Sequence, residues 1–412
     1  MLVFAPVPGT ASETDQLRNA IAAGNWPLAE FEAARLADEK VTDPVDYYFL
    51  VGMLAQVRDQ PARAAQAFRK ALAIRPEVPR IRLELAQALF NMGDDEAARF
   101  HFERVLAAEL PDEVADNVRN FLARIRQRRG WLFDLSLGYL SDSNANSASR
   151  LDTLQINGLV FQLDERARQT TGEGMLITAS ASYTGDHGMH AWGELQRQDY
   201  TRSEFDDMQL RTGAGIKQSG PRTEWFIGPL LGWREYGNAA YSREIGLRTS
   251  GRRQLSTTWW LEGSGEWTYQ HNFRYPSRSG SRTWLSLRAI RNLDARSAIA
   301  LGVDFLREGS DDPQLASTTR GLSASYFADW PYGISAGLTL SHQRIDYDER
   351  QPIFDQNRQD RRNSLTLRLA NRHWQLGGFM PVLSISRIEN HSGIAFFGYQ
   401  RTVFQILGER RF

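Results

Sequence analysis

The sequence has no cysteine, no uninterrupted apolar run long enough for a transmembrane helix, and no excess of either charge. The absence of cysteine excludes disulfides, thiolate metal sites and a cysteine nucleophile. A helix that crosses a bilayer needs roughly 18 successive apolar residues, and no segment offers them. The 49 basic residues balance the 49 acidic ones. We therefore expect no nucleic-acid partner and no polybasic contact with a membrane surface.

Residues that could carry chemistry are sparse. Of the seven histidines, only His187 and His190 lie close together, and they flank an expected tight turn. Ser341 and His342 are neighbours, but successive residues of a strand point to opposite faces, so they cannot act together locally. We expect no enzyme activity, no cofactor and no catalytic or metal site.

Residues 12–128 are predicted to form a helical repeat domain. Three positions of one unit recur 98 − 64 = 34 residues later, which is the tetratricopeptide period: Ala64, Phe68 and Ala71 correspond to Ala98, Phe102 and Val105. Within each unit the small residue lets two helices approach closely, and the phenylalanine fills the space between them. Three units near 14–39, 46–76 and 80–110, with a capping helix at 112–127, are enough to bury a continuous core.

Four residues on the first helices of these units are candidates for a concave groove that receives a client protein. They are Tyr47, Tyr48, Leu85 and Leu89. Their helical spacing is also that of ordinary core residues, and we expect most of them to be core, with at most a few lining a groove.

From the basic junction at 126–130 onwards, apolar residues recur at every second position. In the first segment Trp131, Phe133 and Leu135 share one face, with Asp134 and Ser136 opposite. Such segments start near 131, 173, 189, 205, 223, 241, 256, 281, 296, 318, 332, 361, 376 and 395. Residues 131–412 are therefore predicted to form a 14-stranded antiparallel transmembrane β-barrel, since a tilted strand crosses a bilayer in about ten residues. A soluble sandwich or solenoid is the alternative, but its strands would need a second apolar layer.

A membrane barrel leaves no edge unpaired, so the first strand, 131–140, is expected to close against the last, 394–412. The last segment alternates and ends on an aromatic residue, as the assembly signal of a bacterial outer-membrane barrel does; an ordinary edge strand is the alternative. The candidate residues of this seam and signal are Trp131, Tyr139, Phe396, Phe404 and Phe412.

The alternating pattern of the predicted strands also indicates where the loops lie and which side chains face the lumen. Long polar loops are expected at 142–172, 272–280, 309–318 and 347–360. Arginines expected on the lumenal face include Arg211, Arg234, Arg248, Arg288, Arg344 and Arg368, with acidic partners such as Glu194 and Glu266. The polar stretch 141–147 reads as a turn that satisfies its own backbone, with ion binding as the alternative. Residues 1–11 are expected to be the tail of a secretory signal or a disordered terminus.

The helical repeats, the junction Gly130–Trp131, the polar motif at 142–146 and the aromatic-arginine closing strand together resemble the surface lipoprotein assembly modifiers, the outer-membrane translocators of type XI secretion. The resemblance covers 12–412. It implies a barrel in the bacterial outer membrane with its repeat domain in the periplasm, which moves lipoproteins or soluble haemophilin-like proteins without nucleotide hydrolysis.

The expected partners are a client protein, with or without a periplasmic chaperone, the barrel assembly machinery and outer-membrane lipid. An exopolysaccharide exporter is an alternative, since such exporters also join tetratricopeptide repeats to a barrel. A passive pore with a scaffolding domain is a second alternative.

Overall fold

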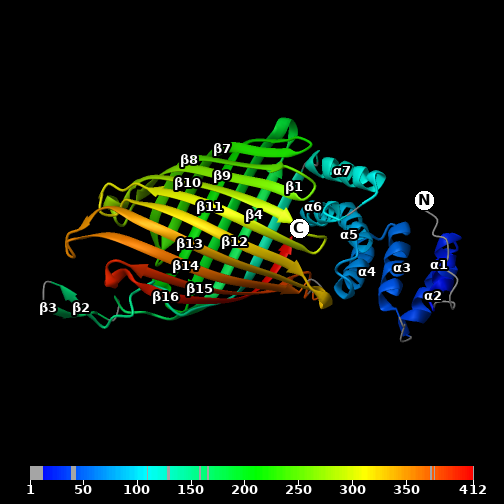
Figure 1. Ribbon diagram of the computed structural model, residues 1–412, viewed down its shortest axis with the longest axis horizontal. Coiled ribbons are helices and arrows are strands. Elements are labelled where there is room, and N and C mark those ends of the chain that lie inside the picture. Colours follow the sequence, from blue (N-terminus) through cyan, green and yellow to red (C-terminus); the bar gives the residue numbers. More distant parts are fainter. Residues whose placement is uncertain are drawn as a thin grey trace.

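The computed structural model describes residues 13–38, 43–108, 110–127, 130–156, 159–164, 167–371, 374 and 376–411. Within these residues, helices come first in the chain and strands follow (Figure 1). The helices lie against one end of a closed barrel, which we call the proximal end; the opposite end is the distal end (Figure 1). The predicted fold class, helical repeats followed by a membrane β-barrel, is confirmed.

The described helices pack as successive antiparallel hairpins around two core clusters, a smaller one formed by α1 to α3 and a larger one formed by α3 to α7. Their bounds are α1 Asp15–Ala22, α2 Trp26–Asp38, α3 Pro44–Val57, α4 Pro61–Ile74, α5 Pro79–Met92, α6 Asp95–Leu106 and α7 Asp112–Gln127. Ala64, Phe68, Ala98 and Phe102, which carry the predicted repeat, are completely buried. Gly93 ends α5 with a φ of 86°, a conformation that glycine adopts without strain. None of the described helices is long and apolar enough to cross a membrane.

The barrel closes antiparallel in the order β1, β16, β15 and so on down to β4, with β1 between β4 and β16. Its strands are β1 Gly130–Asp142, β4 Gly172–Thr184, β5 Met189–Tyr200, β6 Asp207–Ser219, β7 Thr223–Tyr236, β8 Ala239–Gln254, β9 Trp259–Asn272, β10 Gly280–Asn292, β11 Ser297–Glu308, β12 Ser317–Asp329, β13 Ile334–Gln351, β14 Gln356–Asn371, β15 Met380–Ser392 and β16 Tyr399–Arg411. A hairpin of β2 Thr153–Ile156 and β3 Leu159–Gln162 stands apart at the distal end (Figure 1). Each predicted segment corresponds to one barrel strand.

Side chains alternate between an apolar outer surface and a polar interior. Leu301, Leu322 and Leu340 lie on the outer face and are 60%, 60% and 54% exposed. Arg211 and Glu266 lie on the inner face and form an ion pair. A belt of exposed leucines around a closed strand ladder is the surface that a bilayer covers, because every backbone group is already paired.

Three expectations for this part of the chain were wrong. The loop expected at 347–360 is short, because β13 continues to Gln351 and β14 begins at Gln356. Residues 395–397 form the 3-10 turn η6 and β16 begins at Tyr399, so Phe396 precedes the closing strand. Arg344 faces outward, because it is an even number of residues from Leu340 on the same strand.

Candidate functional site at the proximal mouth of the barrel

Buried ion pairs hold the helices against the barrel. The Arg82 guanidinium of α5 donates a hydrogen bond of 3.0 Å to the Asp329 carboxylate, at the proximal end of β12. Arg104 of α6 reaches the same carboxylate at 3.5 Å, and Ser335 donates to its other oxygen. Arg82 also donates to the Nδ1 atom of His101, so that nitrogen carries no proton. One aspartate of the barrel therefore anchors two helices.

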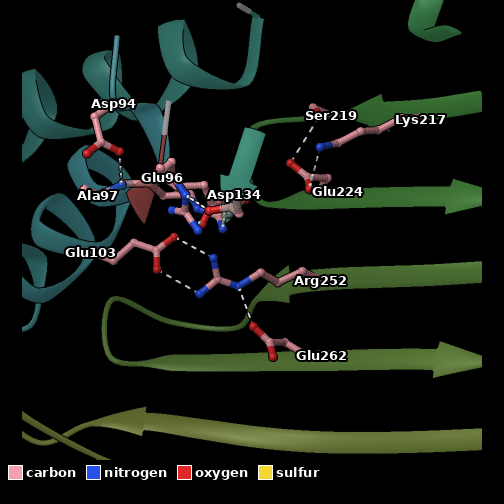
Figure 2. A network of polar contacts seen from close by, with 12 residues as sticks. Asp94, Glu96, Ala97, Glu103, Asp134, Lys217, Ser219, Glu224, Arg252 and Glu262 are labelled. Atoms are coloured by element: carbon pink, nitrogen blue, oxygen red, sulfur yellow. Dashed lines mark hydrogen bonds and ion pairs between the residues drawn. The ribbon is translucent and has the colours of Figure 1, made fainter. Parts of the chain in front are cut away.

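A second anchor joins α6 to β8 and β9. Figure 2 shows Arg252 between Glu103 and Glu262. Arg252 donates two hydrogen bonds of 2.8 Å to Glu103, and its Nε atom lies 3.0 Å from a Glu262 oxygen. Burial raises the pKa of the Glu103 carboxyl above its ordinary value, although Arg252 and Arg99 act in the opposite direction. Because burial outweighs the two arginines, the raised pKa makes Glu103 easier to protonate than an exposed glutamate.

A third contact involves the closing strand. Arg411 of β16 pairs with Asp134 of β1 and lies 3.8 Å from Glu96 of α6. Burial alone would raise the pKa of Glu96, but the nearby Arg99 and Arg411 lower it below its ordinary value. Glu96 is therefore a stable anion that links α6 to the place where the barrel closes (Figure 2).

Two cavities meet at Glu96. One, of about 960 Å³, lies between α5–α6 and the lumenal faces of several strands, and its lining includes Leu89, Phe100, Asp134 and Arg211. The other, of about 1150 Å³, lies beside α6 and α7 and reaches Trp131 and Lys217. Glu96 lines both. An extended polypeptide entering beside the helices would meet Glu96 before it reached the lumen.

Within the described residues, the register between β1 and β16 is shorter than the register between β1 and β4. The register runs from Asp134–Arg411 to Asp142–Val403, whereas β1 pairs with β4 from Gly130 onwards. Residues 130–133 therefore have no described partner on β16. Trp131 is 63% exposed and contacts Phe133 and Tyr183 through its ring.

The distal end of the seam is held firmly. Arg401 of β16 donates to the buried Asp142 carboxylate, through Nε at 2.8 Å. Asn144 donates from its side chain to the carbonyl oxygens of Ala148 and Gln400, at 2.9 and 3.0 Å. The polar motif is thus a turn that satisfies its own backbone and joins β1 to β16. Among the described residues, no group of three or more ligating side chains could hold a metal.

Charged side chains inside the barrel form a connected network. Arg211 bonds Glu244 and Glu266, each at 2.7 Å. Arg248 bonds Glu194 at 3.0 Å and lies 3.5 Å from Glu266. The expected pairing of lumenal arginines with Glu194 and Glu266 is confirmed, and it gives the lumen a polar wall that water can fill.

The predicted site residues lie in different places. Leu85 and Leu89 are each 1% exposed and belong to the helical core, and Leu89 also lines the cavity of about 960 Å³. Tyr47 and Tyr48 are half-buried on α3, and the Tyr47 hydroxyl donates to Ala33 at 3.1 Å.

At the seam, Trp131 and Tyr139 are exposed on the outer face of β1, and Phe404 is the register partner of Ser141. Phe396 packs on Phe354 and Phe397 outside the strand, and Phe412 lies outside the described residues. A role for any of these residues in closure or client contact stays a prediction.

The sequence did not predict the residues that join the helices to the barrel. Arg82 and Glu103 look like solvated residues of amphipathic helices, and their partners Asp329 and Arg252 lie 247 and 149 residues away. Without the tertiary structure, no local signal distinguishes them from other surface charges.

Comparison with known proteins gives consistent matches. Residues 131–412 match the family model described as surface lipoprotein assembly modifier, and residues 58–125 match a tetratricopeptide repeat. The chain is 25% identical over 365 residues to surface lipoprotein assembly modifier 1 of Neisseria meningitidis, covering 85% of this chain and 72% of that protein. It is 25% identical over 348 residues to a surface lipoprotein assembly modifier of Haemophilus influenzae, covering 81% and 70%.

Two further similar proteins carry other names. The hemophilin secretion modulator of Acinetobacter baumannii is 22% identical over 402 residues, covering 91% of this chain and 79% of that protein. Among solved structures, a FadL homologue of Pseudomonas aeruginosa aligns with a TM-score of 0.42 at 8% identity, covering 76% of this chain and 93% of that chain.

Proposed function

The chain belongs to the surface lipoprotein assembly modifier family, and on that premise we propose that it is an outer-membrane translocator that delivers lipoproteins or secreted hemophilin-like proteins to the cell surface. The helices lie in the periplasm and receive the client. The barrel provides the exit, through its lumen or through the seam between β1 and β16.

The observation that carries this proposal is the anchoring of α5 and α6 to lumenal residues of the barrel. Arg252 and Asp329 belong to the inner face, and they bind Glu103 and Arg82 of the helices. A repeat domain that served only as a remote scaffold would not need buried ion pairs, because each partner loses its hydration. The helices are therefore placed to hand a client directly to the proximal mouth.

The client enters beside Trp131 and passes Glu96 on its way into the lumen. This path follows the two cavities that Glu96 lines. No nucleotide-binding loop occurs in the sequence. Net movement then comes from folding or capture of the client outside, and the role requires no catalysis. A periplasmic chaperone would bind the helical domain, and the barrel assembly machinery would insert the barrel.

The test removes one or both partners of the Glu103–Arg252 contact in the full-length chain. Arg252→Gln leaves the buried Glu103 carboxylate without its cation, and breaking a buried pair in this way costs about 3–5 kcal/mol. We expect surface display of a co-expressed client, measured by protease accessibility on intact cells, to fall more than tenfold, since about 1.4 kcal/mol is a factor of ten. Adding Glu103→Gln should restore much of the display, because the buried negative charge is removed.

The matched control is Arg119→Gln, which breaks an exposed pair with Asp116 on α7. It should leave display unchanged. Heat-modifiability on gels must show that every variant inserts as a folded barrel. Equal display in Arg252→Gln and the parent would contradict the delivery role of the helices, and small-solute conductance would then test the passive-pore alternative.

A further inference from the structure

Three arginines stand side by side on the outer face of the barrel. Arg320 of β12 is the register partner of Arg344 of β13, which is in turn the partner of Arg361 of β14. Directly opposed residues of antiparallel strands have Cβ atoms about 5 Å apart, and like charges at such positions repel. The side chains of Arg320 and Arg344 are 65% and 54% exposed, and Arg361 is also exposed. We call these three residues the arginine row.

The protein supplies little negative charge to the arginine row. Asp346 accepts hydrogen bonds from Arg320 at 3.2 Å and from Arg344 at 3.0 Å. In the part of the chain that the structure describes, Arg361 has no ion-pair partner, and its neighbour on β15 is His391. Three guanidinium groups against one carboxylate leave an excess of two positive charges. This arrangement costs free energy unless an anion from outside the chain is bound.

The surface next to the arginine row is hollowed and mostly apolar, and its two charged lining residues, Arg387 and Glu389, pair with each other at 3.3 Å. A shallow groove of about 890 Å³ runs over the outer faces of β9 to β15, and its lining includes Leu301, Leu322, Leu340, Leu365, His342 and Asn363. Leu322, His342 and Asn363 lie two residues from Arg320, Arg344 and Arg361 on the same three strands, toward the proximal end. The cationic row thus stands at the distal limit of an apolar groove.

We propose that the arginine row and this groove form a site for a phosphorylated glycolipid of the outer leaflet, with the chemistry of lipid A. Guanidinium groups bind phosphate oxygens through paired hydrogen bonds, and the two uncompensated charges match two phosphates. The acyl chains lie on the leucines of the groove. The orientation rests on the proposed function, which places the distal end at the outer leaflet.

Two other occupants fit less well. A free phosphate ion would use the arginine row but has no need of the groove. The lipid anchor of a lipoprotein would use the groove but carries no phosphate for the arginine row. The combination of both features favours a lipid that has phosphates and acyl chains together.

The experiment uses the purified full-length chain in a neutral detergent, with bisphosphorylated lipid A as the probe. In the triple variant Arg320→Gln/Arg344→Gln/Arg361→Gln we expect lipid A binding, measured by native mass spectrometry, to fall at least about tenfold, because each basic residue contributes to anionic-lipid binding. Arg243→Gln is the matched control. Arg243 is exposed on the outer face of β8, but its register partners are Trp233 and His271 rather than arginines.

A second readout separates a lipid site from a structural role. Without lipid A, the triple variant should unfold at the same temperature as the parent or at a higher one, because the repulsion within the arginine row is relieved. With lipid A, the order should reverse, since only the parent gains stability from the ligand. A structural role would destabilise the triple variant in both conditions.

Competing probes decide the source of the ligand. Dephosphorylated lipid A, phosphatidylglycerol, inorganic phosphate and a triacylated lipopeptide should each bind more weakly than lipid A. The proposal is overturned if the triple variant binds lipid A as the parent does, if dephosphorylated lipid A or the lipopeptide binds equally well, or if inorganic phosphate alone reproduces the stabilisation. These outcomes do not depend on client transport, so the proposed function can fail or hold separately.

Discussion

The guanidinium of Arg82, which is completely buried, bonds the carboxylate of Asp329 across 247 residues of sequence and across the junction between helices and barrel. Arg104 shares the same carboxylate. Since a second cation and the Ser335 hydroxyl also depend on Asp329, this aspartate is the least replaceable residue of the junction.

Asp329→Asn should weaken docking of the helices more than any single change to a surface charge. The substitution leaves Arg82 buried without its anion, at a cost of about 3–5 kcal/mol. Limited proteolysis of the folded chain measures docking, because helices that have left the barrel are more accessible to protease. The control is Asp304→Asn, an inward-facing residue of β11 that has no ion pair within the described ranges. Equal cleavage rates in the two variants would refute the anchoring role of Asp329.

Docking should depend on pH through Glu103 and Glu96 in opposite directions. Burial raises the pKa of Glu103 in the docked state. Its contribution to the free energy of docking is therefore complete below its ordinary pKa of 4.5 and is lost as the pH rises through the raised value. Arg99 and Arg411 lower the pKa of Glu96 despite its burial. Its contribution to the free energy of docking is therefore present above pH 4.5 and is lost as the pH falls through the lowered value.

Docking of the helices can be measured by energy transfer between two dyes, one attached at Arg119→Cys and the other at Arg222→Cys. The chain has no other cysteine that the dyes would label. From pH 4.5 upwards, docking in the parent should weaken until Glu103 is fully ionised, whereas Glu103→Gln should show no change over that range. Glu96→Gln should abolish the loss of docking below pH 4.5. A parent and a Glu103→Gln variant with the same profile above pH 4.5 would rule out titration of Glu103 as the cause.

The β1–β16 seam should not tolerate a side chain at Gly138. A Cβ atom built there would overlap the backbone carbonyl oxygen of Ile406 on β16, whereas one at Gly193 would meet nothing closer than 3.9 Å. Gly138→Ala should lower the temperature at which the barrel unfolds in detergent gels, by overpacking worth about 1–3 kcal/mol. Gly193→Ala should leave that temperature nearly unchanged. If the two variants behave alike, the seam is more compliant than its geometry indicates.

The distal end of the seam should depend on Asp142. Asp142→Asn removes the charge that binds Arg401, whereas its amide oxygen can still accept the hydrogen bond from the Asn144 backbone N–H. The unfolding temperature of the barrel should fall, and protease should cleave the 143–171 connection more readily. Asp199→Asn is the control, because its pair with Arg197 is exposed on the outer face. A stable, protease-resistant Asp142→Asn barrel would show that the strand ladder alone holds this end.

The repeat domain and the barrel strands were predictable because both rest on local periodicity. The 34-residue spacing that relates Phe68 to Phe102 is written in the sequence, and both rings are buried where it predicts. Alternation also predicts which face of a strand meets lipid, and Arg344 shows how strictly it holds. Counting in twos from Leu340 gives the outward position that the structure confirms, so the lumenal assignment of Arg344 was an error in applying the pattern.

The ends of elements were less predictable, because turn chemistry competes with alternation there. The alternation of the last segment extended back to Ile394, yet 395–397 turn, since Phe396 packs on Phe354 instead of pairing with a neighbouring strand. In the same way, polar residues after Tyr347 suggested a loop, but the ladder of β13 and β14 resumes at Arg350 after a register shift that follows Asp346.

Periodicity and composition were sufficient to establish a helical repeat joined to a membrane barrel, since helices and strands with one apolar face must bury it or present it to lipid. They carried no information about the junction. The pairs Arg82–Asp329 and Glu103–Arg252 form between residues whose sequence surroundings are those of ordinary surface charges. These pairs lose their water only in the folded protein, because only the closed barrel brings the ends of β8 and β12 to α5 and α6.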